Sequence, residues 1–160
     1  MRIVVAAVGR LKAGAERDLA ERYRERAAKT GRALGIRYIE VIEVRDSRAR
    51  EPERRILEES IALASEIPDG AVTVTLDGRG DCASSESFAG RLRAWNDAGR
   101  ANIFFAIGGA DGLGEVLRER ADLTLAFGTV TWPHQLVRIM LLEQIYRALT
   151  ILSGHPYHRD

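Results

Sequence analysis

Short apolar runs alternate along this chain with longer segments of helical periodicity, and this alternation constrains the fold more than any other feature. Five runs rich in apolar and β-branched residues are typical of strands: residues 3–8, 36–44, 71–76, 102–107 and 123–127. The first run is almost unbroken, as in a strand that is buried on both faces. Strands separated by helices form largely parallel sheets covered on both sides, so the sequence predicts an α/β fold.

The helical segments carry recognisable start and stop signals. One ends near Gly31, the next begins with Pro52 in its first turn, and a third is capped by Ser84 or Ser85 and stops at Gly99. Two more are expected at about 115–120 and 134–152. No repeat, low-complexity tract or Pro/Ser-rich linker interrupts the 160 residues, so a single domain over residues 1–160 is predicted.

The net charge and the cysteine content indicate the compartment in which the protein functions, but they do not identify a binding partner. The formal net charge is only +1, so no charge excess indicates nucleic acid or a membrane surface. Only Lys12 and Lys29 among the 24 basic residues are lysines. Abundant arginine is compatible with phosphate recognition, but a genome whose base composition favours Arg codons is the better explanation, because many arginines stand beside acids at helical spacing, as at 51–55. The single cysteine, Cys82, and an amino-terminal apolar run too short for a signal peptide favour a cytoplasmic protein.

The last helical segment is apolar around nearly its whole circumference. Four polar residues, Arg138, Glu143, Gln144 and Arg147, interrupt it too often for a membrane span. In a chain of this size, one side is expected to pack on the protein's own sheet and the other on a partner subunit. The sequence therefore predicts a homodimer and no membrane association.

Three glycine-rich or turn-rich loops follow predicted strands, after Leu76, Ile107 and Phe127. In parallel sheets, ligands bind where strand ends feed such loops, so a ligand crevice is expected there. The segment 108–112 (GGADG) lacks the ending of a phosphate-binding P-loop and the spacing of a dinucleotide fingerprint. A purely structural tight turn remains an equal alternative for it. No nucleophile elbow supports a serine hydrolase.

The carboxyl-terminal tail packs two imidazoles, a phenol and a guanidinium into a few residues: His155, Tyr157, His158 and Arg159. These groups transfer protons or bind anions, although tail histidines are also often merely solvated. His155 and His158 lack a third neighbouring ligand, so no metal site is expected.

The ordered set of motifs in the second half of the chain resembles one family, the large-subunit ribosomal RNA methyltransferase H family, and the resemblance extends over essentially the whole chain. The motifs, in order, are VTLD at 74–77, IGGADGL at 107–113, TWPHQLVR at 131–138, EQIYRA at 143–148 and HPYHR at 155–159. The Trp132-Pro133 pair before His134 is a mild departure from the usual aliphatic or Phe-Pro.

The resemblance implies a SPOUT-type parallel sheet, a deep carboxyl-terminal trefoil knot and an obligate homodimer. It also implies S-adenosylmethionine as methyl donor and no metal. The cofactor contacts that it implies are Leu76, Gly108, Phe127, Gly128, Thr129, Val130, Thr131 and Trp132.

The implied reaction is N3-methylation of a pseudouridine in 23S ribosomal RNA, with the assembled ribosome as substrate. The acceptor nitrogen carries a proton at neutral pH, so a base must remove it or a cation must stabilise the developing anion. We expect Tyr157 or His158 to handle the proton, and Arg138 and Arg159 to contact RNA. In a dimer, the tail of one subunit is expected to complete the pocket of the other. The alternative is a non-catalytic ribosome-associated RNA-binding module of the same fold.

Overall fold

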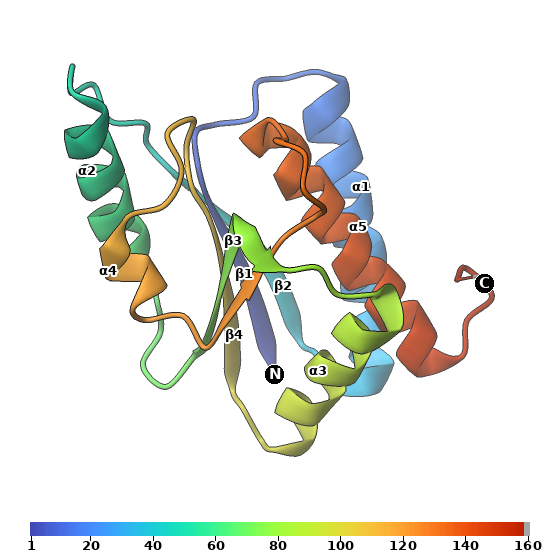
Figure 1. Ribbon diagram of the computed structural model, residues 1–160. Coiled ribbons are helices and arrows are strands. Elements are labelled where there is room, and N and C mark those ends of the chain that lie inside the picture. Colours follow the sequence, from blue (N-terminus) through green and yellow to red (C-terminus); the bar gives the residue numbers. More distant parts are fainter. Residues whose placement is uncertain (159–160) are drawn as a thin grey trace.

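A five-stranded parallel sheet forms the centre of the protein, as the computed structural model shows for residues 1–158 (Figure 1). The strand order is β2-β1-β4-β3-β5, and every neighbouring pair runs parallel. The strands are β1 (Arg2–Val8), β2 (Tyr38–Val44), β3 (Val72–Asp81), β4 (Asn102–Ile107) and β5 (Leu123–Leu125). The helices are α1 (Ala15–Gly31), the 3-10 turn η1 (Arg32–Leu34), α2 (Pro52–Ser65), α3 (Ser85–Asp97), α4 (Glu115–Arg118) and α5 (His134–Ser153). The predicted α/β fold is confirmed.

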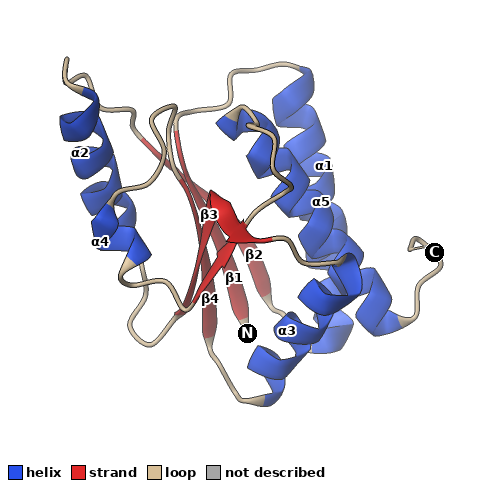
Figure 2. Ribbon diagram, viewed as in Figure 1, coloured by secondary structure: helices blue, strands red, loops and turns tan. Residues whose placement is uncertain are grey.

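Helices cover both faces of the sheet. Figure 2 shows α1, α3 and α5 on one side and α2 with α4 on the other. Side chains alternate along β1: Ile3, Val5 and Ala7 join the core under the first group, while Val4 and Ala6 join the core under the second. This double burial explains why the first strand reads as an unbroken apolar run.

The helix signals in the sequence correspond to real helix ends. Pro52 is the first residue of α2, where its missing N–H costs no hydrogen bond. Of the two candidate caps for α3, Ser84 is the one used: its Oγ accepts a hydrogen bond from the backbone N of Ser87 at 3.1 Å.

The end of β3 differs from the sequence prediction. The strand was expected to stop at Leu76, but pairing with β5 resumes at Asp81, so that Leu76 and Asp81 both lie opposite Leu125. Residues 77–80 bulge out between these two partners. A Cβ on Gly80 would lie 2.7 Å from backbone atoms of Thr124, so only glycine permits this close approach. The bulge brings residues 77–80 over the carboxyl edge of the sheet.

Helix α5 is the longest element and packs between α1 and α3. Leu141, Leu142, Ile145 and Leu149 are fully buried, whereas Leu136 near its start is 38% exposed. No helix within residues 1–158 is long and apolar enough to cross a membrane. The homodimer stays a prediction.

Candidate functional site

The three loops singled out in the sequence meet around one cavity of about 470 Å³ at the carboxyl edge of the sheet. A cavity of this size is within the range that small ligands and cofactors occupy. All eight residues expected to contact the cofactor line it: Leu76, Gly108, Phe127, Gly128, Thr129, Val130, Thr131 and Trp132. These residues are up to 56 positions apart in sequence, so only the order of the strands brings them together.

The loop after β5 closes on itself at the cavity wall. The indole Nε1 of Trp132 donates a hydrogen bond to the carbonyl oxygen of Phe127 at 2.9 Å. Val130 and Trp132 remain 60% and 40% exposed at the mouth of the cavity. β5 ends at Leu125, two residues earlier than expected, so Phe127 belongs to this loop instead of the sheet.

The loop after β4 folds tightly on itself. A Cβ on Gly108 would lie 2.6 Å from the carbonyl carbon of Gly112, and Gly109 and Gly112 form an isolated bridge. Close approach of a cofactor would be one reason for a glycine at position 108. The structure shows a nearer reason, since the loop's own backbone occupies the space of a Cβ. Gly109 lies against the buried carboxyl of Glu59, whose pKa is raised by burial.

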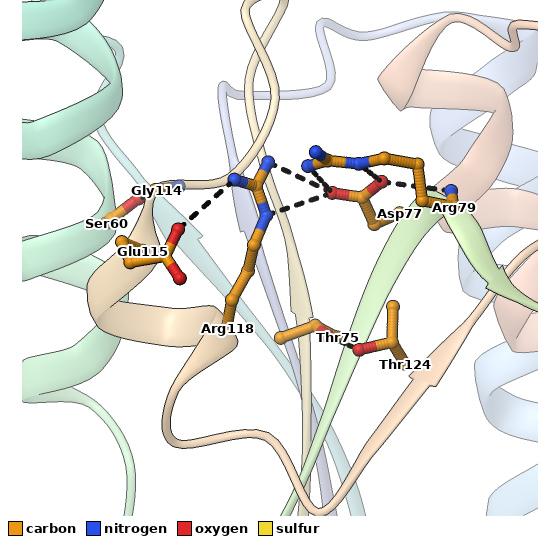
Figure 3. Close-up of polar contacts among 8 residues, drawn as sticks. All are labelled: Ser60, Thr75, Asp77, Arg79, Gly114, Glu115, Arg118 and Thr124. Carbon is orange, nitrogen blue, oxygen red and sulfur yellow. Dashed lines mark hydrogen bonds and ion pairs between the residues drawn. The ribbon is translucent and has the colours of Figure 1, made fainter.

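A charged cluster at the cavity wall was not predicted from the sequence (Figure 3). Asp77, in the β3 bulge, accepts hydrogen bonds from Arg79 and from Arg118 on α4, the latter at 3.2–3.3 Å. Arg118 also lies 3.7 Å from Glu115. The Arg79 hydrogen bonds are the largest cause that lowers the pKa of Asp77 to about 2. All three residues Asp77, Arg79 and Arg118 line the cavity, so its wall carries two guanidinium groups around one carboxylate.

The only sequence signal for this cluster was the position of Asp77 directly after a predicted strand. Arg118 is 41 residues further along the chain, and no pattern in the sequence pairs it with Asp77.

A second cavity of about 390 Å³ adjoins the first and shares Leu125–Gly128 with it. Its other walls come from residues 82–85 and from α5, through Met140 and Gln144. The hydroxyl of Ser85 donates to Oε1 of Gln144 at 2.9 Å, which fixes the start of α3 on α5. Cys82 is exposed at this cavity.

The described part of the tail lies on α5 and α3, away from the cavity of its own chain. The Tyr157 hydroxyl donates to Oε1 of Glu143 at 3.1 Å, and the Tyr157 ring packs against Tyr146 with 4.6 Å between centroids and a tilt of 54°. His158 Nε2 lies 2.6 Å from Oε1 of Glu86. Among the residues that the structure describes, no tail residue lines the cavity of about 470 Å³. The predicted Arg159 lies outside the described residues.

The tyrosine in this tail is held as a phenol. Burial is the largest cause that raises the pKa of Tyr157 above its ordinary value, and hydrogen bonding with Tyr23 and Glu143 acts in the same direction. In this position the Tyr157 hydroxyl donates its proton to a hydrogen bond.

Arg138 is buried, with 1% of its side chain exposed. One guanidinium nitrogen donates to Glu43 Oε1 at 2.7 Å, and another donates to the carbonyl of Gly9 at 2.6 Å. The expectation that Arg138 contacts RNA does not fit this position, because the surrounding protein covers the guanidinium. Arg138 instead joins α5 to the ends of β1 and β2.

No group of three or more His, Cys, Asp or Glu side chains within residues 1–158 is arranged to hold a metal ion.

Comparisons with known proteins agree with the geometry. A family profile described as predicted SPOUT methyltransferase matches residues 1–158. The chain is 60% identical over 159 residues to ribosomal RNA large subunit methyltransferase H of Rhodopseudomonas palustris strain BisB18, covering 99% of both chains. It is 56% identical to the protein of the same name from Bradyrhizobium sp. strain ORS 278, covering 99% of this chain and 98% of that one.

Among solved structures, a probable methylase family protein from Haemophilus influenzae Rd KW20 has the same kind of fold, with a TM-score of 0.51 and 10% identity over 99% of this chain and 70% of that chain. Because the profile match and the full-length relatives extend over nearly all of its residues, the chain belongs to the SPOUT methyltransferases and, among them, to the ribosomal RNA large subunit methyltransferase H family.

Proposed function

We propose that this protein is an S-adenosylmethionine-dependent methyltransferase that N3-methylates a pseudouridine of 23S ribosomal RNA in the assembled ribosome. The observation that carries the proposal is the convergence of three loops on one cavity in a chain whose full-length relatives are named large-subunit ribosomal RNA methyltransferases. The whole chain, residues 1–160, acts as one SPOUT domain, in the cytoplasm, where ribosomes are found.

The cavity has the walls that this cofactor needs. Leu76 and Val137 offer apolar surface, while the loop 127–132 offers backbone N–H and C=O groups for an adenine edge. Arg79 and Arg118 at the wall offer guanidinium N–H donors, which suit a carboxylate. When bound, S-adenosylmethionine supplies a methyl group on a cationic sulfur, a chemistry for which no metal is required.

Proton handling is assigned to His158, with Arg159 as an RNA contact. The acceptor imide nitrogen must lose its proton as the methyl group is transferred, and a positioned imidazole performs this role near neutral pH. Tyr157, as a phenol with a raised pKa, instead donates a hydrogen bond that orients the tail or the substrate. Arg138 is a positioning residue that fixes the strand ends beside the cavity.

The tail acts in trans within a homodimer in this proposal. Within one chain the described tail residues do not line the cavity, so the imidazole must come from a second copy for the two to meet. Leu136, exposed near the start of α5, supports an interface on that helix.

A knotted path of the carboxyl-terminal part of the chain is part of the same proposal. Asp81 pairs with β5 after the 77–80 bulge, Ala126 N donates to the Asp81 carbonyl at 3.0 Å, and the start of α3 is bonded to α5 through Ser85. These contacts support a chain path in which α5 passes through the preceding loop to form a trefoil knot. An experimental structure whose chain trace shows an unthreaded α5 would contradict it.

A complementation assay tests the composite site. Val130→Arg places a bulky charge at the cavity mouth on an exposed side chain, and His158→Ala removes the imidazole. Each variant alone should fail to transfer a labelled methyl group to purified ribosomes. Mixed and re-annealed, they should recover about one quarter of wild-type activity, because half of the dimers are hybrids with one intact site.

The outcomes separate the alternatives. No recovery on mixing, with hybrid dimers present, contradicts a tail acting in trans. If wild-type protein binds ribosomes but shows neither calorimetric binding of S-adenosylmethionine nor methyl transfer, the non-catalytic RNA-binding module replaces the enzyme.

A further inference from the structure

Two basic loops leave the same carboxyl edge of the sheet at which the cavity lies. Residues 9–14 follow β1, and residues 45–51 follow β2, the strand beside it (Figure 1). Both loops therefore leave the same edge as the cavity loops after β3, β4 and β5. Their exposed cationic side chains are Arg10, Lys12, Arg45, Arg48 and Arg50, and we call this set the basic rim.

The basic rim concentrates charge that the chain as a whole does not have. The two loops carry those five cations against two carboxylates, Asp46 and Glu51, whereas the full chain has a net charge of only +1. The rest of the protein is therefore slightly acidic. Because of this distribution, a chain that is nearly neutral as a whole presents a positive surface at this edge of the sheet.

In the part of the chain that the structure describes, the arginines of the second loop have no acidic partner. Some arginines on helices pair with nearby acids, as Arg54 does with Glu58 at 2.8 Å. Within residues 1–158, no ion pair involves Arg45, Arg48 or Arg50, and in the first loop Arg10 lies a loose 3.9 Å from Glu43. Their guanidinium groups are thus available for an external anion.

The backbone of residues 45–51 is nevertheless held firmly by α2. Glu59 accepts a hydrogen bond from Ser47 N at 2.9 Å, and Glu58 accepts one from Ser47 Oγ at 2.6 Å. Arg55 donates to two carbonyls of the loop, at residues 49 and 50, at 3.1 and 2.8 Å. A loop fixed in this way loses little conformational entropy when it binds.

The same arginine joins the loop to the cavity. Arg55 forms a two-pronged contact with Asp111, with nitrogen–oxygen distances of 2.7 and 3.1 Å, and Asp111 lies in the cavity loop 108–112. Arg55 therefore connects the loop of the basic rim to the cavity wall by hydrogen bonds. A ligand bound on the rim is held at a fixed position relative to the cavity.

We propose that the basic rim docks the phosphate backbone of the ribosomal RNA that flanks the target nucleotide, with Arg45, Arg48 and Arg50 as its main contacts. This inference rests on the proposed function. Guanidinium groups bind phosphate oxygens in a two-pronged geometry, and each neutralised phosphate adds to the salt dependence of binding. The contacts carry no sequence information; they set register while the cavity selects the base.

The test compares two triple variants. Arg45→Ala/Arg48→Ala/Arg50→Ala removes the rim charges, and the matched control Arg32→Ala/Arg37→Ala/Arg100→Ala removes three exposed arginines at the amino ends of the strands. Binding to purified ribosomes and to protein-free ribosomal RNA is measured across a salt series. The rim variant should lower the slope of log affinity against log salt by about 2–3. It should also raise KM for ribosomes at least tenfold, with S-adenosylmethionine binding unchanged.

The results that would contradict this proposal lead to three different conclusions. Equal losses in both triple variants, or a rim variant with wild-type slope and KM, overturns the docking assignment while the enzyme stands. Weakened binding to ribosomes with unchanged binding to protein-free RNA overturns RNA as the partner in favour of a ribosomal protein. A wild type that neither binds S-adenosylmethionine nor methylates ribosomes refutes the proposed function itself.

Discussion

Replacing Glu43 should destabilise this protein more than replacing the arginine that it binds. Arg138 is almost fully buried, whereas the Glu43 side chain is 34% exposed. Burial lowers the pKa of Arg138, and the Glu43 carboxylate opposes that effect. Glu43→Gln leaves a buried cation without its counter-charge, while Arg138→Met leaves a carboxylate that water can reach.

The magnitudes follow from this asymmetry. Breaking a buried pair while its charge stays behind costs roughly 3–5 kcal/mol. The Gly9 carbonyl at 2.6 Å still accepts from Arg138, so the lower end, about 3 kcal/mol, is expected for Glu43→Gln. Arg138→Met loses hydrogen bonds but also removes the cost of burying the charge, so about 1–2 kcal/mol is expected. The double variant should cost less than the sum of the single variants.

Thermal unfolding followed by circular dichroism at pH 7 provides the measurement. For a chain of this length, 3 kcal/mol corresponds to a fall in Tm of roughly 6–12 °C. A Glu43→Gln variant that is more stable than Arg138→Met would refute the electrostatic argument. An Arg138→Met variant with wild-type Tm and lost ribosome binding would show that Arg138 contacts RNA, as the sequence first indicated.

Three further predictions concern the cavity. Gly108→Ala forces a Cβ against the carbonyl of Gly112 and should weaken S-adenosylmethionine binding at least tenfold by calorimetry. Gly90→Ala, in α3 with open space around it, should leave binding intact and stabilise the fold by up to about 1 kcal/mol; equal effects of the two would contradict the close-approach argument. Because the pKa of Asp77 is lowered to about 2, its stabilisation is fully present above pH 4 and is lost between about pH 4 and 2. Asp77→Asn should therefore lower the free energy of unfolding by about 1–2 kcal/mol at pH 7, and by progressively less as the pH falls. Urea unfolding measures this difference between wild type and variant. A difference that does not shrink at low pH would refute the assignment. Trp132→Phe removes one hydrogen bond that closes the cavity loop and should weaken cofactor binding about 2- to 12-fold, whereas wild-type affinity would show that the loop needs no such closure.

The sequence by itself determined the kind and order of the helices and strands and the set of loops that meet at the cavity. The run at residues 3–8, the proline that starts α2 and the serine that caps α3 act through local backbone and burial preferences, which a pattern along the chain records. Resemblance to a family supplied the eight cavity residues, and the structure places all of them around one cavity.

Only the tertiary structure decided which distant charges meet. Asp77 pairs with Arg118 across 41 positions, and Glu43 with Arg138 across 95, because β3 lies beside β5 and α5 packs over the ends of β1 and β2. The order of strands also extended β3 to Asp81 and gathered the basic rim beside the cavity. Hydrophobic periodicity records which face of each element is buried, but it does not record which elements become neighbours, and ion pairs depend on that arrangement.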